Sequence, residues 1–208
     1  MKLNDAQKVV ESLQAYLSPA CTRMEVAGSV RRGKAEVGDI EFVLQPNLDL
    51  PVLPIRPEFG QPIPPRHTRV LERYLYDYEK GGMIQMLESG PRKKKFLMVA
   101  EQVKVELYIN LPPSQWGVQM LIRTGPKEFG HWMVTNKSHG GALPDGYYVK
   151  HQVVWDEGKI ERDLMLDNPN LAISMLNDGN YTPMPAESDF LTFCGLDWIE
   201  PKDRKAPW

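Results

Sequence analysis

Two short stretches of the sequence alternate between apolar and polar residues, and this alternation constrains the fold more than any other feature. In DIEFVL, residues 39–44, every second residue is apolar, and the positions between them begin with Asp39 and Glu41. VKVELYIN, residues 103–110, repeats the pattern with Glu106 at the centre of its polar face. Because successive side chains of a strand point to opposite faces, both stretches predict β-strands that turn one face toward a core. We expect the carboxylates on the other face.

The rest of the first half predicts helices, a loop and a hairpin. We expect a first helix with Asn4 as its N-cap and another over residues 66–80. Residues 46–65 contain 7 prolines in 20 residues, which excludes a helix or a central strand and predicts a long surface loop. MIQMLE (83–88) and KKFLMVA (94–100) predict a hairpin around a Gly-Pro turn.

The second half mixes helices and strands in the same way. A helix is expected to begin near Pro113, and TGP (124–126) ends it and starts another helix, which stops at Gly140-Gly141. GYYVKHQVVW (146–155) and KIERDL (159–164) predict an antiparallel pair around a DEGK turn. Two short helices are expected to close the chain. The whole pattern predicts an α+β protein.

Composition and charge restrict the class of protein. The net charge is -2 and 25% of residues are charged, which is typical of a globular chain. No apolar run approaches the about 20 residues of a membrane span, and the N-terminus lacks a signal-peptide pattern. We therefore expect an intracellular, cytoplasmic protein that does not bind membranes, with Cys21 and Cys194 as reduced thiols.

Charge is distributed unevenly along the chain. Residues 145–204 hold 12 acids and 5 bases, whereas the remainder holds 15 acids and 20 bases. A surface that binds nucleic acid needs positive charge to neutralise phosphates. Such a surface is therefore expected mainly in the first two-thirds of the chain.

The carboxylates on the two predicted strands have the chemistry of a metal site. Asp39 and Glu41 share one face of a strand, and Glu106 stands on the polar face of another. Carboxylate oxygens suit Mg²⁺, and two such ions can stabilise the attacking and leaving oxygens of a phosphoryl displacement. An acid-x-acid triplet alone is weak evidence, since chance gives roughly three or four in a chain with 27 acids.

The residues just before the acid pair favour a phosphate ligand. Gly28-Ser29 is a small step that lets the backbone approach a phosphate closely. Arg32 can fork onto phosphate oxygens. A solvated basic turn is the alternative for this stretch taken alone. The combination with the acids is more specific than either part.

These motifs together resemble the family X DNA polymerases. The resemblance is carried by GSVRRGKAEVGDIEF (28–42), VEL (105–107), RTGPKEF (123–129) and ESDFLTFCGLDWIEPKDR (187–204). It implies a nucleotidyltransferase palm over residues 1–112, with a mixed sheet flanked by helices. It implies a small α+β thumb-like domain over residues 113–208 that contacts nucleotide and DNA. Since the family commonly has a cis peptide in its Thr-Gly loop, Gly125-Pro126 is expected to be cis.

The resemblance also implies roles for individual residues. Asp39, Glu41 and Glu106 would form the catalytic carboxylate triad and hold two Mg²⁺ ions, for which Mn²⁺ can substitute. A nucleoside triphosphate would be gripped by Gly28, Ser29, Arg32 and the Gly38 backbone. Further nucleotide contacts are implied for Arg123, Thr124, Gly125 and Phe129. The implied reaction is attack of a 3′-hydroxyl on the α-phosphate, with pyrophosphate leaving.

Basic side chains provide candidate contacts for DNA. The resemblance implies Lys104 near the primer terminus and His131 near the templating base. Arg66, Arg69 and Arg73 are expected on one helix face, and Lys93, Lys94 and Lys95 in a basic turn. Such residues bind backbone phosphates without reading sequence. A solvated surface is the alternative.

Some positions depart from the family pattern. Glu106 stands where the family usually has Asp, which adds a methylene to a metal ligand. Arg123 replaces an aromatic residue near the sugar, so the choice between ribo- and deoxynucleotides is open. The resemblance starts at about residue 6, in the implied palm, so we expect no lyase activity of the kind that the family's N-terminal domain provides. Small viral members consist of the same two parts, so a viral or phage origin is one expectation.

Three functions follow from these observations. The first is a minimal, monomeric family X DNA polymerase that adds deoxynucleotides to primed or gapped DNA, as in short gap filling and DNA repair. The second is a template-independent nucleotidyltransferase that acts on an RNA end, a protein or a small molecule. The third is an inactive binding module with the same fold, which the three retained acids disfavour.

Overall fold

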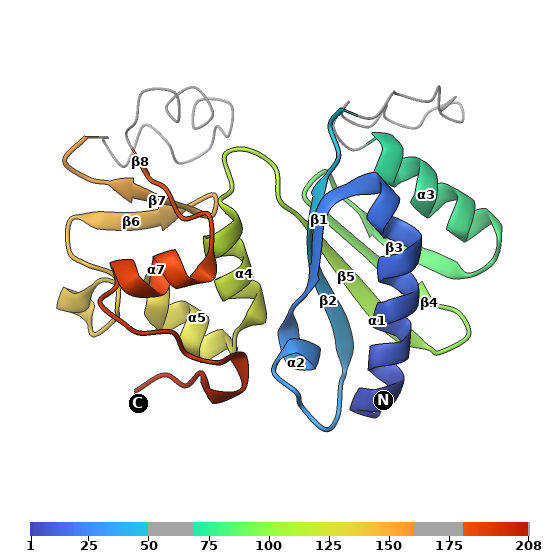
Figure 1. Cartoon of the computed structure of the whole chain (residues 1–208), viewed down its shortest axis with the longest axis horizontal. Helices are drawn as coiled ribbons and strands as arrows, with labels where there is room; N and C mark the ends of the chain where they lie inside the picture. The colour runs from blue at the N-terminus through green and yellow to red at the C-terminus, as the bar shows by residue number, and fades with distance from the viewer. Residues whose placement is uncertain (50–68, 160–180, 208) are drawn as a thin grey trace. The chain divides into compact units, whose positions relative to one another are not determined.

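The computed structural model describes residues 1–49, 69–159 and 181–207 (Figure 1). The chain divides into two compact units, Met1–Asn110 and Leu111–Trp208, and each unit is described by itself. The division expected from the sequence fell after residue 112. None of the described helices has the length and apolar character needed to span a membrane.

The first unit is a five-stranded mixed sheet in the order β1-β2-β5-β4-β3. Strands β2 and β5 are parallel, and the other neighbouring pairs are antiparallel. The strands are β1 (Cys21–Val26), β2 (Asp39–Pro46), β3 (Ile84–Ser89), β4 (Lys93–Met98) and β5 (Val103–Ile109). The helical elements are α1 (Leu3–Leu17), η1 (Ser18–Ala20), α2 (Gly28–Arg31) and α3 (Arg69–Lys80).

The alternation in the sequence places one face of this sheet in the core, as predicted. Ile40 and Phe42 of β2 and Val105 of β5 are completely buried. Burying side chains of this size stabilises the fold by about 1.5–3 kcal/mol each. Helices α1 and α3 lie on this face (Figure 1), and Tyr16 of α1 stacks on Tyr78 of α3 with ring centroids 4.1 Å apart.

Two details of the first unit differ from expectation. Helix α1 begins at Leu3, not after Asn4, because Lys2 has an extended backbone and forms a β-bridge with Glu36. That bridge fixes the chain direction at Lys2, two residues before the expected cap. Residues 50–65 of the Pro-rich run lie outside the described residues, and so do residues 66–68 of the expected helix 66–80.

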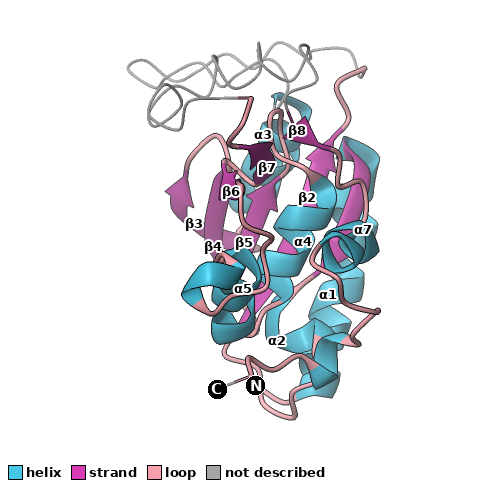
Figure 2. Cartoon of the chain, turned by 90° about the vertical axis from the view of Figure 1, so that its left-hand side faces the viewer, coloured by secondary structure: helices cyan, strands magenta, loops and turns pink. Residues whose placement is uncertain are grey.

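The second unit packs helices against a three-stranded antiparallel sheet in the order β6-β7-β8. Its elements are α4 (Trp116–Thr124), α5 (Lys127–Val134), η3 (Lys137–His139), β6 (Tyr147–Lys150), β7 (Val153–Asp156), β8 (Tyr181–Thr182), α7 (Glu187–Phe193) and η5 (Pro201–Asp203). Its core includes Leu121, Phe129, Val154 and Phe190, all completely buried. Both units combine helices and strands (Figure 2), which confirms the α+β class.

Several boundaries in the second unit correct the sequence expectations. The first helix begins at Trp116, three positions after the expected Pro113. The stretch 146–155 contains a complete hairpin, because His151 and Gln152 adopt left-handed φ values of 53° and 57° and turn the chain between β6 and β7. The second helix ends at Val134, before the expected glycines. The Gly125-Pro126 peptide is cis, as predicted.

Candidate active site

The parallel pairing of β2 and β5 brings the three candidate acids onto one face of the sheet. In the register, Glu41 lies opposite Glu106, and Asp39 lies opposite Lys104. Partners in register point to the same face, so all three carboxylates project from the side opposite the apolar core. The alternation in the sequence predicted this shared face.

Glu106 is held by three side chains, and both of its oxygens are engaged. Lys95 Nζ lies 2.8 Å and Lys93 Nζ lies 3.3 Å from Glu106 Oε1. The hydroxyl of Tyr108 donates a hydrogen bond to Glu106 Oε2. Burial raises the pKa of Glu106, but the hydrogen bonds from Lys95 and Tyr108 and the charge of Lys93 outweigh it and lower the pKa to about 2.

Glu41 packs directly against the Gly28-Ser29 step. A Cβ atom on Gly28 would lie 1.9 Å from Glu41 Oε2, and Gly28 has a φ of +58°, so the position requires glycine on both counts. The Ala27 N–H donates a 2.8 Å hydrogen bond to the Glu41 carbonyl, which ties the start of α2 to β2. The glycine therefore places the short helix and the acid in contact.

Ser29 follows Gly28 on α2 and carries a hydroxyl. Its Oγ is buried and has no hydrogen-bond partner among the residues that the structure describes. A buried polar atom without a partner costs about 1–3 kcal/mol, so it points to a ligand that supplies one. An anionic oxygen would accept this hydrogen bond. Arg32, four residues beyond Gly28, is half-buried.

The residues fit a divalent cation in chemistry and in backbone position. Three carboxylates on one face of two neighbouring strands are the donors that Mg²⁺ prefers. Within residues 1–49, 69–159 and 181–207, no group of three or more acidic, His or Cys side chains has converged on a metal position. Glu106 is paired with lysines, and Glu41 rests against Gly28.

The expected basic turn is wrong. Residues 93–95 form the start of strand β4, because they pair in register with Tyr108, Leu107 and Glu106 of β5. Lys94 is 3% exposed, forms an ion pair with Glu72 and donates a hydrogen bond to Ser89. Its ammonium cannot contact a DNA phosphate in this arrangement.

The other candidate DNA contacts are less constrained. Lys104 is exposed at the start of β5. Arg73 Nε forms a 2.8 Å ion pair with Asp77 on the same helix, and both side chains are partly exposed. Arg66 lies outside the described residues, as does the side chain of Arg69. In the second unit, His131 is exposed on α5.

The candidate nucleotide contacts in the second unit lie at the α4–α5 junction. Thr124 and Gly125 are buried at the end of α4, and Arg123 is half-buried. Phe129 is completely buried in the core, so its side chain packs there and does not reach a surface where it could touch a nucleotide. Trp132 packs against the same core, with its ring 5.8 Å from that of Phe129.

Sequence reasoning missed the partners of Glu106. Tyr108 stands two residues after Glu106 and therefore on the same face, a signal that was present in the alternation. The role of Lys93 and Lys95 depends on the β4–β5 register, which no local pattern reveals. These three side chains complete the site around Glu106.

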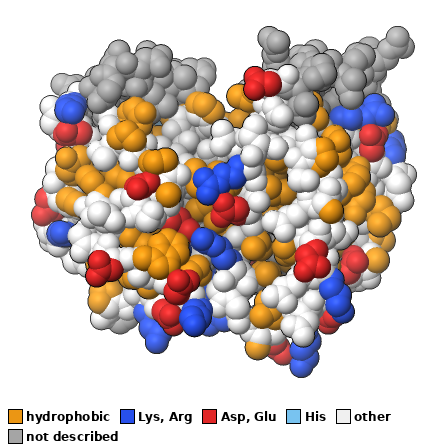
Figure 3. Space-filling view, viewed as in Figure 1, with side chains coloured by type: hydrophobic (Ala, Val, Ile, Leu, Met, Phe, Trp, Pro, Cys, Tyr) orange, Lys and Arg blue, Asp and Glu red, His pale blue; other side chains and the backbone are white. Residues whose placement is uncertain are grey.

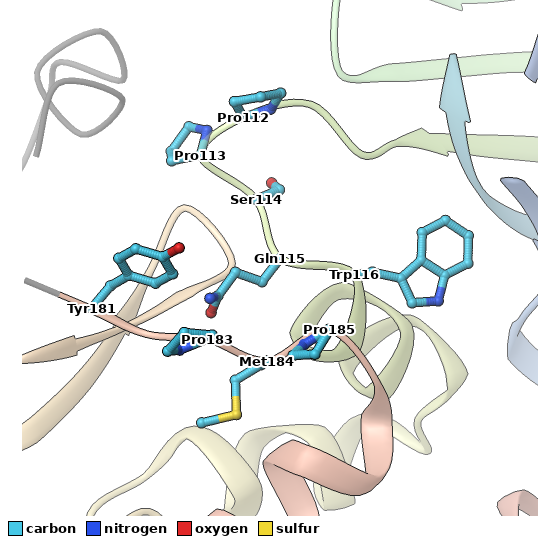
Figure 4. A pocket seen from close by; sticks show the side chains of 9 residues that line it. All are labelled: Pro112, Pro113, Ser114, Gln115, Trp116, Tyr181, Pro183, Met184 and Pro185. Carbon is cyan, nitrogen blue, oxygen red and sulfur yellow. The ribbon is translucent and has the colours of Figure 1, made fainter. Parts of the chain in front are cut away.

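The second unit also contains an open pocket of about 290 Å³ that the sequence did not predict (Figure 4). It lies where the chain enters α4 and where β8 leads toward α7. Trp116, Tyr181, Met184 and several prolines line it, and Figure 4 shows them around Gln115. The Gln115 amide is used internally, donating to the Thr182 carbonyl at 3.0 Å.

Comparisons with known proteins identify the fold. A scan against protein-family models found no match, and neither did a search of curated proteins. Two solved structures of Leishmania infantum polymerase beta, a ternary P/T complex and a ternary gap complex, superpose with a TM-score of 0.72 and 19% sequence identity. The match covers 99% of this chain and 76% and 70% of those chains. The chain therefore has a polymerase beta-like fold, as the sequence resemblance predicted.

Proposed function

We propose that this protein is a polymerase-like nucleotidyltransferase whose active site is the carboxylate face of β2 and β5. The observation that carries the proposal is the register: Glu41 lies opposite Glu106, with Asp39 on the same face. The Gly28-Ser29 step packs against Glu41 and adds a buried hydroxyl without a described partner. A carboxylate cluster beside such a step suits a nucleotide held with divalent cations.

In this proposal, the three acids bind the metal ions, whereas Ser29 and Arg32 bind the nucleotide. Asp39 and Glu41 would hold two Mg²⁺ ions and Glu106 the one nearer the acceptor hydroxyl. When bound, such ions supply positive charge to the attacking and leaving oxygens. Ser29 donates to a phosphate oxygen, and Arg32 neutralises its charge. Positioning and electrostatic stabilisation then provide most of the rate.

We propose further that the acceptor is a DNA 3′-hydroxyl and that the protein is a minimal family X-type polymerase that fills short gaps. The motifs of residues 28–42 and 123–129 support this proposal. So does the fold, since the similar Leishmania structures are described as P/T and gap complexes. Lys104 on the site's own strand and His131 on α5 are the exposed candidates for DNA contacts.

A template-independent transfer to another acceptor is the second candidate. Figure 3 shows Lys and Arg interspersed with Asp and Glu over the face in view. The lysines of β4 are engaged by Glu106 and Glu72. Residues 145–204 are strongly acidic. These observations leave less positive charge for DNA than the sequence alone suggested.

One experiment separates the two candidates. Gapped, primed and unprimed DNA are offered with Mg²⁺ or Mn²⁺ and each nucleoside triphosphate in turn. Incorporation directed by the template supports the polymerase, whereas untemplated tailing or labelling of an acceptor other than DNA supports the second candidate. Inactivity toward every acceptor tried contradicts both. Asp49→Asn, on an exposed acid outside the site, is the matched control for Asp39→Asn.

A further inference from the structure

Lys95 occupies a position among the carboxylates that the proposed function does not explain. Across three neighbouring strands, Glu41 of β2, Glu106 of β5 and Lys95 of β4 lie side by side in register. The ammonium of Lys95 lies 2.8 Å from Glu106 Oε1. The pKa of Lys95 is raised, first by Glu106 and to a smaller extent by the charge of Asp39. A cation shared by these carboxylates would compete with this ammonium.

The contacts of Glu106 leave no oxygen unengaged. Oε1 faces Lys95 and Lys93, and Oε2 accepts the hydrogen bond of Tyr108. A divalent ion bound to Glu106 needs one of these oxygens and repels the ammonium beside it. An ion that binds through Oε1 therefore competes with both lysines for the same oxygen.

Lys95 is the better candidate to withdraw. The ammonium of Lys93 also lies 3.6 Å from Glu88 and over the ring of Tyr108. These two contacts help to hold Lys93 beside Glu106. The side chains of Lys95 and Lys93 are 30% and 34% exposed, so the long stem of either lets its ammonium swing into water. The other contacts of Lys93 are therefore what distinguishes the two lysines.

We propose that Lys95 is a resident counter-cation of Glu106, and that a divalent ion enters the site by displacing it. Metal binding is then a cation exchange. In the metal-free protein, the ammonium balances the carboxylates and keeps Glu106 in place. Its presence lowers the affinity of the site for the ion. This inference rests on the proposed function, since it takes Asp39, Glu41 and Glu106 as the metal ligands.

The direct test measures Mn²⁺ binding by electron paramagnetic resonance in four proteins. Lys95→Met keeps most of the apolar stem and removes the charge. This variant should bind Mn²⁺ roughly three- to tenfold more tightly than wild type, because it lacks one partly exposed charge that competes with the ion. Lys8→Met makes the same charge change at an exposed lysine of α1 and should match wild type. Asp39→Asn should bind weakly.

The outcomes distinguish failure of the cation exchange from failure of the metal site. Tighter binding in Lys95→Met supports the exchange. Equal or weaker binding in Lys95→Met, with wild type binding and Asp39→Asn deficient, overturns the exchange and leaves the proposed function standing. Mn²⁺ binding to neither wild type nor Lys95→Met overturns the metal site itself, and the exchange with it.

A second measurement follows the wild-type protein and uses one conservative variant, Lys95→Arg, for assignment alone. The lysine ammonium resonances are followed by nitrogen-15 NMR during a Mg²⁺ titration, with Lys95 assigned by comparison with Lys95→Arg. The Lys95 signal should move or broaden as the ion binds, while that of Lys8 stays in place. A Lys95 signal that is unchanged while Mg²⁺ binds overturns the exchange.

Discussion

Replacing Gly28 by Ala tests the link between the glycine step and the acid of the site. The added Cβ would lie 1.9 Å from Glu41 Oε2 and 2.8 Å from its Cδ, so the carboxylate must move away. The backbone φ of +58° adds strain, because a left-handed conformation costs an L-residue about 1–2 kcal/mol. The variant should therefore lose stability and also lose the position of Glu41.

Gly33→Ala is the matched control. Gly33 has a φ of +67°, but no atom lies within 4 Å of an added Cβ. It therefore carries the backbone strain without the collision with Glu41. Both variants should lose about 1–2 kcal/mol of unfolding free energy, measured by urea denaturation followed by fluorescence.

Nucleotidyl transfer should separate the two variants. Gly33→Ala should keep nearly full activity at a temperature where it is folded. Gly28→Ala should fall by about 100-fold, the size of effect that a displacement of about 1 Å in a catalytic group produces. Equal activities in the two variants, at equal folded fractions, would show that Glu41 does not depend on its contact with Gly28 and would refute this account of the step.

Three further predictions concern charge and packing. In metal-free protein, the difference in unfolding free energy between wild type and Glu106→Gln should shrink by about 1–3 kcal/mol as the pH falls from 5 to 2. The pKa of Glu106 is lowered from 4.5 to about 2, so its ionised carboxylate stabilises the fold above pH 4.5 and this stabilisation is lost as the pH falls through 2. A difference in urea titrations that does not change with pH would contradict the lysine contacts. Gly117→Ala should destabilise the second unit by about 1–3 kcal/mol in thermal unfolding, since the added Cβ would lie 2.1 Å from the Ala186 carbonyl oxygen. An unchanged melting temperature would contradict the close packing of Gly117 against Ala186. Arg204→Met should lower the unfolding free energy by about 3–5 kcal/mol in urea denaturation, because Arg204 pairs at 2.8 Å with Glu187 and both residues are buried. Adding Glu187→Met should restore much of this loss. A double variant as unstable as Arg204→Met would show that the loss comes from packing and not from an unpaired charge.

The strands that carry the acids were predictable because a single rule determines them. Side chains alternate along a strand, so the pattern of residues 39–44 and 103–110 specified both the elements and the shared face of Asp39 and Glu41. The contact of Gly28 with Glu41 was only partly visible. The sequence indicated a close approach at glycine, but not that the approaching group is the acid itself.

The lysine partners of Glu106 could not be predicted, because they depend on pairing between strands. The sequence KKK at 93–95 is equally compatible with a solvated turn and with a strand. Only the register with β5 shows that Lys93 and Lys95 face Glu106 while Lys94 points into the core. Local charge therefore suggested DNA binding, whereas tertiary structure engages the same lysines within the protein.

Turns formed by unusual residues were the other source of error. His151 and Gln152 adopt left-handed backbone conformations that are more common for Gly or Asn, so the hairpin of β6 and β7 had no turn signal. Phe129 shows the limit of a motif. Its position in RTGPKEF implied a nucleotide contact, but the helical period of α5 turns its ring into the core.

The central claim is that Asp39, Glu41 and Glu106 form the site of nucleotidyl transfer. Its most direct test is pyrophosphate release from nucleoside triphosphates with Mg²⁺ and primed DNA, compared between wild type and Asp39→Asn, with circular dichroism spectra to verify folding. We predict release by wild type and loss of release in the folded Asp39→Asn variant, because the substitution removes one proposed metal ligand from the carboxylate face of β2. Pyrophosphate release by Asp39→Asn at the wild-type rate would contradict the assignment of this site.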